Sequence, residues 1–107
     1  MYKGASMITS LKNPQIRNII QLNQKAKERR VQKLFTAEGR KMFLEAPADW
    51  VEKVYVSETI EKDEELMARV QRFPMETVSD TVFRQMCDTQ TPQGILTVLR
   101  SPSYDME

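Results

Sequence analysis

The stretch Ile95-Leu96-Thr97-Val98-Leu99 decides the fold of this chain. Four of its five residues are large and apolar, and polar and apolar positions do not alternate along it. A strand with one face in water alternates between the two kinds of residue, whereas a strand covered on both faces is apolar almost throughout. The stretch therefore predicts a central strand in a sheet that carries helices on both faces.

The preceding residues supply helices and strands in alternation. Asn13 suits a helix N-cap and Pro14 the first helical position, and Ile16, Ile19 and Ile20 follow at helical spacing. Further strands are predicted at 34–37, 51–56 and 75–78, and a further helix at 40–46. Ser57 or Thr59 is expected to cap the next helix, whose core stripe is Leu66, Met67, Val70 and Phe73. Ser79 or Asp80 is expected to cap the last helix, whose inward-facing residues are Val82, Phe83, Met86 and Cys87. This order predicts a three-layer α/β/α sandwich around a small, mainly parallel or mixed four-stranded sheet.

Size and composition exclude several classes of protein. The 107 residues suffice for one domain. With one cysteine and no histidine, the chain lacks an internal disulfide, the usual nitrogen and sulfur ligands of zinc, and any Ser-His or Cys-His catalytic pair. Cys87 is predicted to be a small core residue. No apolar run suits a membrane span or a signal peptide, so the cytoplasm is the expected compartment.

The charges are sorted along the chain. From Met1 to Phe43 there are ten Lys or Arg against two Glu, a net charge of +8, and from Leu44 to Glu107 there are six against thirteen acidic residues, a net charge of −7. This segregation indicates a basic surface that faces a polyanion. The alternative is a basic N-terminal helix that packs beside acidic ones.

Three stretches resemble the substrate-binding domain that precedes the catalytic domain in SpoU-family (TrmH-like) RNA 2′-O-ribose methyltransferases. They are Ser10-Leu11-Lys12-Asn13-Pro14, Leu34-Phe35-Thr36-Ala37-Glu38-Gly39-Arg40-Lys41, and Thr91-Pro92-Gln93-Gly94-Ile95. The resemblance covers nearly the whole chain and implies a fold similar to the ribosomal proteins that bind kink-turn RNA. That fold agrees with the element order derived above.

The resemblance also implies a division of the chain. Residues 7–100 are expected to form the RNA substrate-binding domain, residues 1–6 a leader or cloning remnant, and residues 101–107 the start of a linker. In the family, the linker leads to a knotted domain that binds S-adenosylmethionine, carries the catalytic residues and forms a homodimer. The resemblance therefore implies an RNA partner, ribosomal or transfer RNA, and neither a cofactor nor a catalytic residue within these 107 residues.

The turn at Glu38-Gly39 is the first candidate site. It precedes a helix start whose free N–H groups favour an anion, and Arg40 and Lys41 add positive charge. Glu38 is expected to cap the helix start or to hydrogen-bond a base edge or ribose hydroxyl. The alternative is a plain turn glycine beside solvated cations.

A dense basic cluster after the first helix is the second candidate. It consists of Lys25, Lys27, Arg29, Arg30 and Lys33, with Arg17 on the outer helix face as a further member. These cations are predicted to contact several phosphates, since each neutralised phosphate steepens the salt dependence of binding. The alternative is a solvated connector.

The loop that contains Thr91 and Gln93 is the third candidate. Their hydroxyl and amide groups suit unpaired bases or ribose hydroxyls, whereas the alternative, and the favoured interpretation, gives Pro92 and Gly94 a purely architectural role. Phe35, Phe43, Trp50 and Tyr55 are expected in the core rather than stacked on bases. Two other functions fit the same residues: a stand-alone kink-turn-binding protein, and a protein-interaction module that uses the acidic half.

Overall fold

The structure is a computed structural model that describes residues 7–87 and 92–101. Its elements are α1 (Pro14–Gln24), α2 (Ala26–Gln32), β1 (Leu34–Glu38), α3 (Arg40–Glu45), η1 (Ala48–Trp50), β2 (Val51–Ser57), α4 (Glu58–Glu61), α5 (Glu64–Val70), β3 (Met75–Val78), α6 (Asp80–Met86) and β4 (Ile95–Arg100). The strands form one mixed sheet in the order β1-β4-β2-β3, in which β2 and β3 are parallel and β4 is antiparallel to both of its neighbours. The predicted fold class and the central position of β4 are confirmed.

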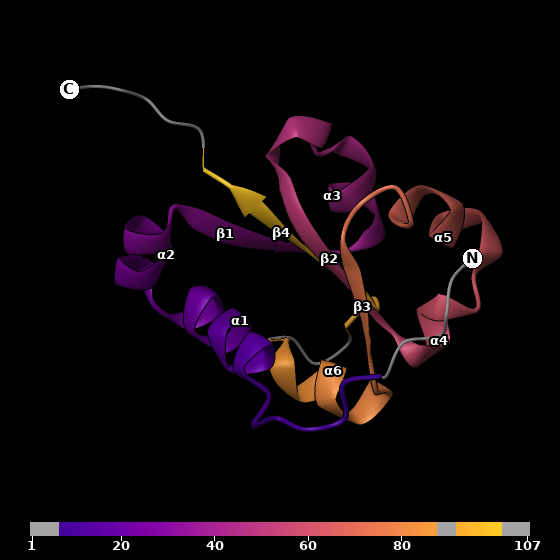
Figure 1. The fold of residues 1–107 in the computed structure, drawn as a ribbon, viewed down its shortest axis with the longest axis horizontal. Helices are drawn as coiled ribbons and strands as arrows, with labels where there is room; N and C mark the ends of the chain where they lie inside the picture. The colour runs from indigo at the N-terminus through magenta and orange to yellow at the C-terminus, as the bar shows by residue number, and fades with distance from the viewer. Residues whose placement is uncertain (1–6, 88–91, 102–107) are drawn as a thin grey trace.

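Helices cover both faces of the sheet (Figure 1). One core cluster joins α1 and α6 to the sheet and includes Ile16, Ile19, Leu22, Val82, Phe83, Met86, Leu96 and Val98. The other joins α3 and α5 to the opposite face and includes Phe43, Val54, Val56, Leu66, Met67, Val70, Ile95 and Leu99. Because β4 contributes residues to both clusters, its apolar character on both faces is explained.

Three of the four aromatic residues assigned to the core pack on the second face. Phe43 is buried and meets Phe73 edge to face, with 5.9 Å between ring centroids. Phe35 and Trp50 are partly buried against the same cluster. Tyr55 is buried on the first face, where its hydroxyl donates to Gln15 Oε1 at 2.7 Å. The core roles predicted for Phe35, Phe43, Trp50 and Tyr55 are confirmed.

Helix caps explain most of the helix starts, and one of them divides a helix expected to be continuous. Asn13 caps α1 and Ser79 caps α6, as predicted. Ser57 accepts from the N–H of Ile60 and caps only the short α4. Asp63, two residues after the end of α4, then accepts from the N–H of Leu66 and starts α5, because aspartate is well suited to N-capping.

Two further pieces were not predicted. Residues 26–32 form α2, which has no buried residue and therefore no apolar stripe to reveal it. Ile8 forms a parallel bridge to Val78 at the outer side of β3, with its N–H donating to the carbonyl of Thr77 at 2.8 Å. No helix in the described ranges is both long and apolar enough to cross a membrane.

Thr97 gives a direct test of the packing of β4. Its side chain is fully buried and its Oγ1 has no hydrogen-bond partner among the described residues. A buried hydroxyl without a partner is destabilising, so Thr97→Val should raise the free energy of unfolding by about 1 kcal/mol in urea titrations. In the matched control Thr36→Val, the lost hydroxyl donates to Asn23 Oδ1, and stability should fall. Equal losses in the two variants would refute this account of Thr97.

Candidate nucleic-acid interface

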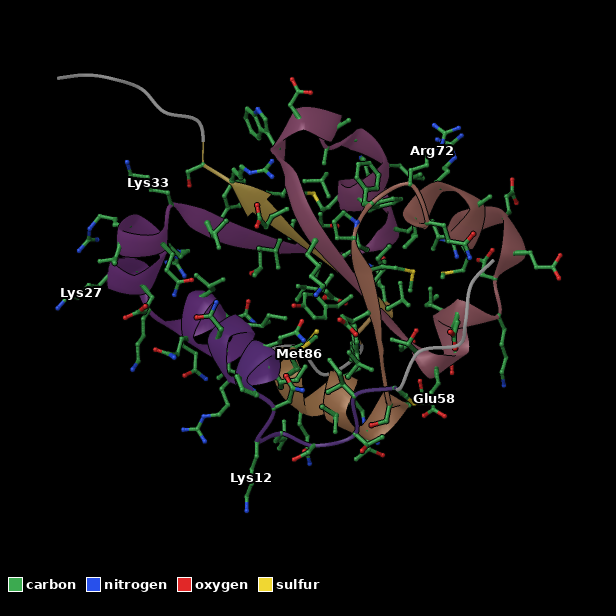
Figure 2. All side chains as sticks on the ribbon, viewed as in Figure 1. Lys12, Lys27, Lys33, Glu58, Arg72 and Met86 are labelled. Carbon is green, nitrogen blue, oxygen red and sulfur yellow. The ribbon has the colours of Figure 1, made fainter. Side chains whose placement is uncertain are left out.

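The structure places five predicted cations on the outside of α1 and α2. We call them the basic surface: Arg17 on α1, Lys25 between the helices, Lys27 and Arg30 on α2, and Lys33 at its C-cap. All five are exposed, and within residues 7–87 and 92–101 none of their side chains forms an ion pair. Figure 2 shows Lys27 and Lys33 at one end of the molecule and Arg72 near the other. These five cations therefore share one part of the surface, whereas Arg40 pairs with Asp63 at the start of α5.

Arg29 differs from the other members of the predicted cluster. Its guanidinium donates to the carbonyl oxygen of Leu22 at 2.6 Å and to that of Asn23 at 3.4 Å, both in the last turn of α1. Carbonyl groups at a helix end lack partners within the helix and favour a cation. Arg29 therefore joins α2 to the end of α1, and a phosphate contact by this residue stays a prediction.

A second polar contact holds α2 against α1. Asn18 and Gln32 exchange two amide hydrogen bonds of 2.9 and 2.8 Å, and Gln32 Nε2 also donates to Glu28 Oε1 at 2.9 Å. A helix of seven residues is marginal alone, and α2 buries no side chain. The orientation of Lys27 and Arg30 thus depends on polar contacts rather than on apolar packing.

Removal of Arg29 should loosen this arrangement. We expect Arg29→Ala to lower the free energy of unfolding by about 1 to 2 kcal/mol, because two helix-end carbonyls lose a charged donor. The matched control is Arg30→Ala, which removes the same charge from an exposed neighbour and should cost less than about 0.5 kcal/mol. Urea titration followed by circular dichroism measures both, and equal stability of the two variants would contradict the bridging role of Arg29.

The Glu38-Gly39 turn and the loop before β4 lie against each other, although 55 residues separate Glu38 from Gln93. The Glu38 carboxylate accepts from the backbone N–H of Gln93 at 2.5 Å, and Gln93 Oε1 accepts from the N–H of Arg40 at 3.2 Å. The expectation that Glu38 caps the helix start is wrong, because the Gln93 side chain occupies that position and Glu38 instead fixes the Gln93 backbone. Gly39 has φ +117°, and a Cβ there would lie 3.0 Å from Gln93 Oε1.

These contacts between the Glu38-Gly39 turn and Gln93 reduce the number of groups at the first candidate site that are free to bind a phosphate. The N–H of Arg40 is occupied by Gln93, and its guanidinium forms a 2.8 Å ion pair with Asp63. The hydrogen bond from the Leu66 N–H and that from Arg40 lower the pKa of Asp63. Lys41 is exposed, and its side chain has no partner in the described part of the chain. The hypothesis of phosphate binding at this turn therefore depends mainly on Lys41. Thr91 lies outside the described residues.

A hollow of about 410 Å³ lies beside β1. It is lined by Asn23, Arg29, Phe35, Thr36, Glu38, Cys87 and Leu96. Its amide and hydroxyl groups are already paired, since Asn23 donates to the Met86 carbonyl at 3.1 Å and accepts from Thr36.

Burial, and then the nearby charge of Glu38, raises the pKa of Cys87 to about 12, so the thiol stays neutral. Cys87 is buried in the core, as predicted. Across residues 7–87 and 92–101, no group of His, Cys, Asp or Glu is placed to hold a metal ion.

Two polar residues important for the basic surface were missed from sequence. Asn18 and Gln32 lie 14 residues apart, and they meet only because the chain reverses at Lys25, whose backbone is extended. No periodicity or motif connects them. The hydrogen bonds between the Asn18 and Gln32 amides are therefore apparent only from the structure.

Parts of known RNA methyltransferases share this fold. An rRNA methyltransferase from Sinorhizobium meliloti matches with a TM-score of 0.71 and 24% identity over 91% of this chain and 37% of that chain. An RNA 2′-O ribose methyltransferase matches with a TM-score of 0.75 and 25% identity over 95% and 40%, respectively. The SpoU methyltransferase AviRb from Streptomyces viridochromogenes, in complex with AdoMet, matches with a TM-score of 0.66 and 17% identity over 88% and 35%. The chain spans less than half the length of each of them.

The family model of the MRM3-like substrate binding domain matches residues 13–97, and the chain belongs to this family. The resemblance to a SpoU-type substrate-binding domain is thereby confirmed. A search of curated proteins gives no significant match.

Proposed function

We propose that this chain is the RNA-recognition domain of a SpoU-type rRNA 2′-O-ribose methyltransferase. The observation that carries the proposal is the position of the basic surface on a domain of the substrate-binding family: five exposed cations without ion-pair partners in the described residues lie along α1 and α2. Unpaired cations on one side of a domain attract a phosphate backbone and release its counterions. RNA is the polyanion that such a methyltransferase modifies.

In this proposal the predicted site residues have two kinds of role. Arg17, Lys25, Lys27, Arg30, Lys33 and Lys41 contact phosphates, since their side chains are exposed and free of ion-pair partners in the described residues. Arg29, Glu38, Gly39, Arg40 and Gln93 hold the RNA-facing segments in place through the contacts described above. Arg40 and Gln93 are also exposed, so their side chains can contact RNA as well.

Methyl transfer is proposed for another domain of the full protein. Residues 7–100 would form the recognition domain, and a further domain would bind S-adenosylmethionine, as AviRb does, and form a homodimer. The hollow beside β1 does not fit this cofactor, because its amide and hydroxyl groups are paired within the fold. No step of methyl transfer is therefore assigned to the residues of this chain.

A salt series tests the proposal. Labelled rRNA fragments and transfer RNA are titrated with the chain and followed by fluorescence anisotropy. Six phosphate contacts predict a slope of log Kd against log salt of about 4 to 5.5 units, with tighter binding to an rRNA fragment. Absence of RNA binding at low salt would refute the proposal, and equal, weak binding to all RNAs would remove its specificity for rRNA.

A further inference from the structure

A groove of about 440 Å³ runs along the outer face of α1. It is lined by Leu11, Arg17, Ile20, Gln21 and Lys25. Positions 17, 20 and 21 share one helix face because they are three and four residues apart, and Leu11 comes from the segment before the helix. The groove thus combines Arg17 and Lys25 of the basic surface with three uncharged residues, Leu11, Ile20 and Gln21.

The polar groups of this groove are free, in contrast to those of the hollow beside β1. The side chains of Arg17, Gln21 and Lys25 have no hydrogen-bond or ion-pair partner within the described ranges. In the hollow beside β1, Asn23 and Thr36 bond to each other and Arg29 bonds to the end of α1. Unlike the hollow beside β1, the groove therefore offers a ligand polar side chains that have no partner among the described residues.

Apolar surface lies between these polar groups. Leu11 exposes 37% of its area, and Ile20 is only partly buried against the core. The groove thus differs from a purely charged surface, because Leu11 and Ile20 add apolar area between its polar groups. Apolar surface beside an amide, a guanidinium and an ammonium group matches a nucleotide: the base covers the apolar surface and the phosphate meets the cations.

We infer that this groove binds one unpaired nucleotide of the RNA, with its base against Leu11 and Ile20. The inference rests on the proposed function and specifies the substrate as single-stranded at this point. The Gln21 amide can hydrogen-bond a base edge, and Arg17 and Lys25 meet the phosphates on either side of the nucleotide. In an RNA duplex the bases are stacked and paired, so a duplex cannot place a base in the groove.

Replacements that keep the charge constant test the groove separately from the basic surface. Wild type, Leu11→Ser and Gln21→Ala are titrated with labelled single-stranded oligoadenylate and with the duplex of oligoadenylate and oligouridylate. Each replacement should weaken binding of the single strand about tenfold and leave both the duplex affinity and the salt slope unchanged. The control is Val31→Ser, which removes a 67% exposed apolar side chain on α2 outside the groove and should bind both RNAs like wild type.

The outcomes separate this inference from the proposed function. If Leu11→Ser and Gln21→Ala bind the single strand as tightly as the wild type does, the groove does not bind a nucleotide. The proposed function is then unaffected, because the wild type still binds RNA. Failure of the wild type to bind any RNA would overturn both. An acidic, leucine-containing peptide that binds wild type tighter than oligoadenylate, and that loses binding in Leu11→Ser, would assign the groove to a protein partner and overturn the inference.

Discussion

Replacement of Lys25, Lys27 and Arg30 together by alanine should weaken rRNA binding about 100-fold at 0.1 M salt. Each phosphate contact contributes about 0.7 to 0.9 units to the salt slope, so the slope should fall by about 2 to 3 units. The fold should be preserved, because α2 has no buried residue and these side chains have no ion-pair partner among the described residues. Fluorescence anisotropy over a salt series measures the affinity and the slope together.

The control for this variant removes the same charge from the other end of the molecule. Lys62, Arg69 and Arg72 are exposed in and around α5, and Figure 2 shows Arg72 far from Lys27 and Lys33. Their triple replacement by alanine should change the affinity by less than about threefold, since charges beyond a Debye length are screened. Equal losses in both triple variants would mean that net charge, rather than the basic surface, governs binding.

Replacement of Gly94 by alanine should lower the free energy of unfolding by about 3 to 5 kcal/mol. Gly94 has φ +86°, and a Cβ there would lie 2.4 Å from Ile60 Cγ1 and 2.8 Å from Ser57 Oγ. The backbone at Gly94 is held in place, because its carbonyl accepts from the Ser57 N–H at 2.8 Å and the next residue begins the central strand β4. Urea titration followed by circular dichroism measures the loss.

Gly39→Ala is the comparison that separates steric overlap from backbone strain. Gly39 also has positive φ, at +117°, but an added Cβ would meet the end of the flexible Gln93 side chain at 3.0 Å. This variant should therefore lose about 1 to 3 kcal/mol, mainly from backbone strain. A loss in Gly94→Ala no larger than in Gly39→Ala would contradict the close packing of Gly94 against Ile60. The favoured architectural interpretation of Gly94 predicts the larger loss.

The layers of the fold could be predicted because buried faces produce recognisable patterns of apolar residues in the sequence. The residues Ile95–Leu99 carry both core clusters, so their continuous apolar character revealed a strand with two covered faces. Asn13 and Ser79 marked helix starts because their side chains cap the free N–H groups. The same rule misjudged the region after Ser57, where Asp63 provides a second cap that divides the helix.

Much of the candidate site could not be predicted, because it depends on contacts between distant residues. The charge count marked all the cations of the basic surface, yet it could not separate Arg29, which bonds to the end of α1, from its exposed neighbour Arg30. Likewise, the motifs around Glu38 and Gln93 were recognised individually, while their mutual hydrogen bonds follow from the antiparallel pairing of β1 with β4. Net charge describes composition, and only the fold determines which cations remain unpaired.

The central claim is that RNA binds along α1 and α2, and backbone amide chemical shifts measured by NMR during titration with an rRNA fragment test it most directly. We predict that the largest shifts occur at residues 15–33, whereas amides of α5 stay unchanged. Shifts concentrated in α5, with residues 15–33 unaffected, would contradict the account.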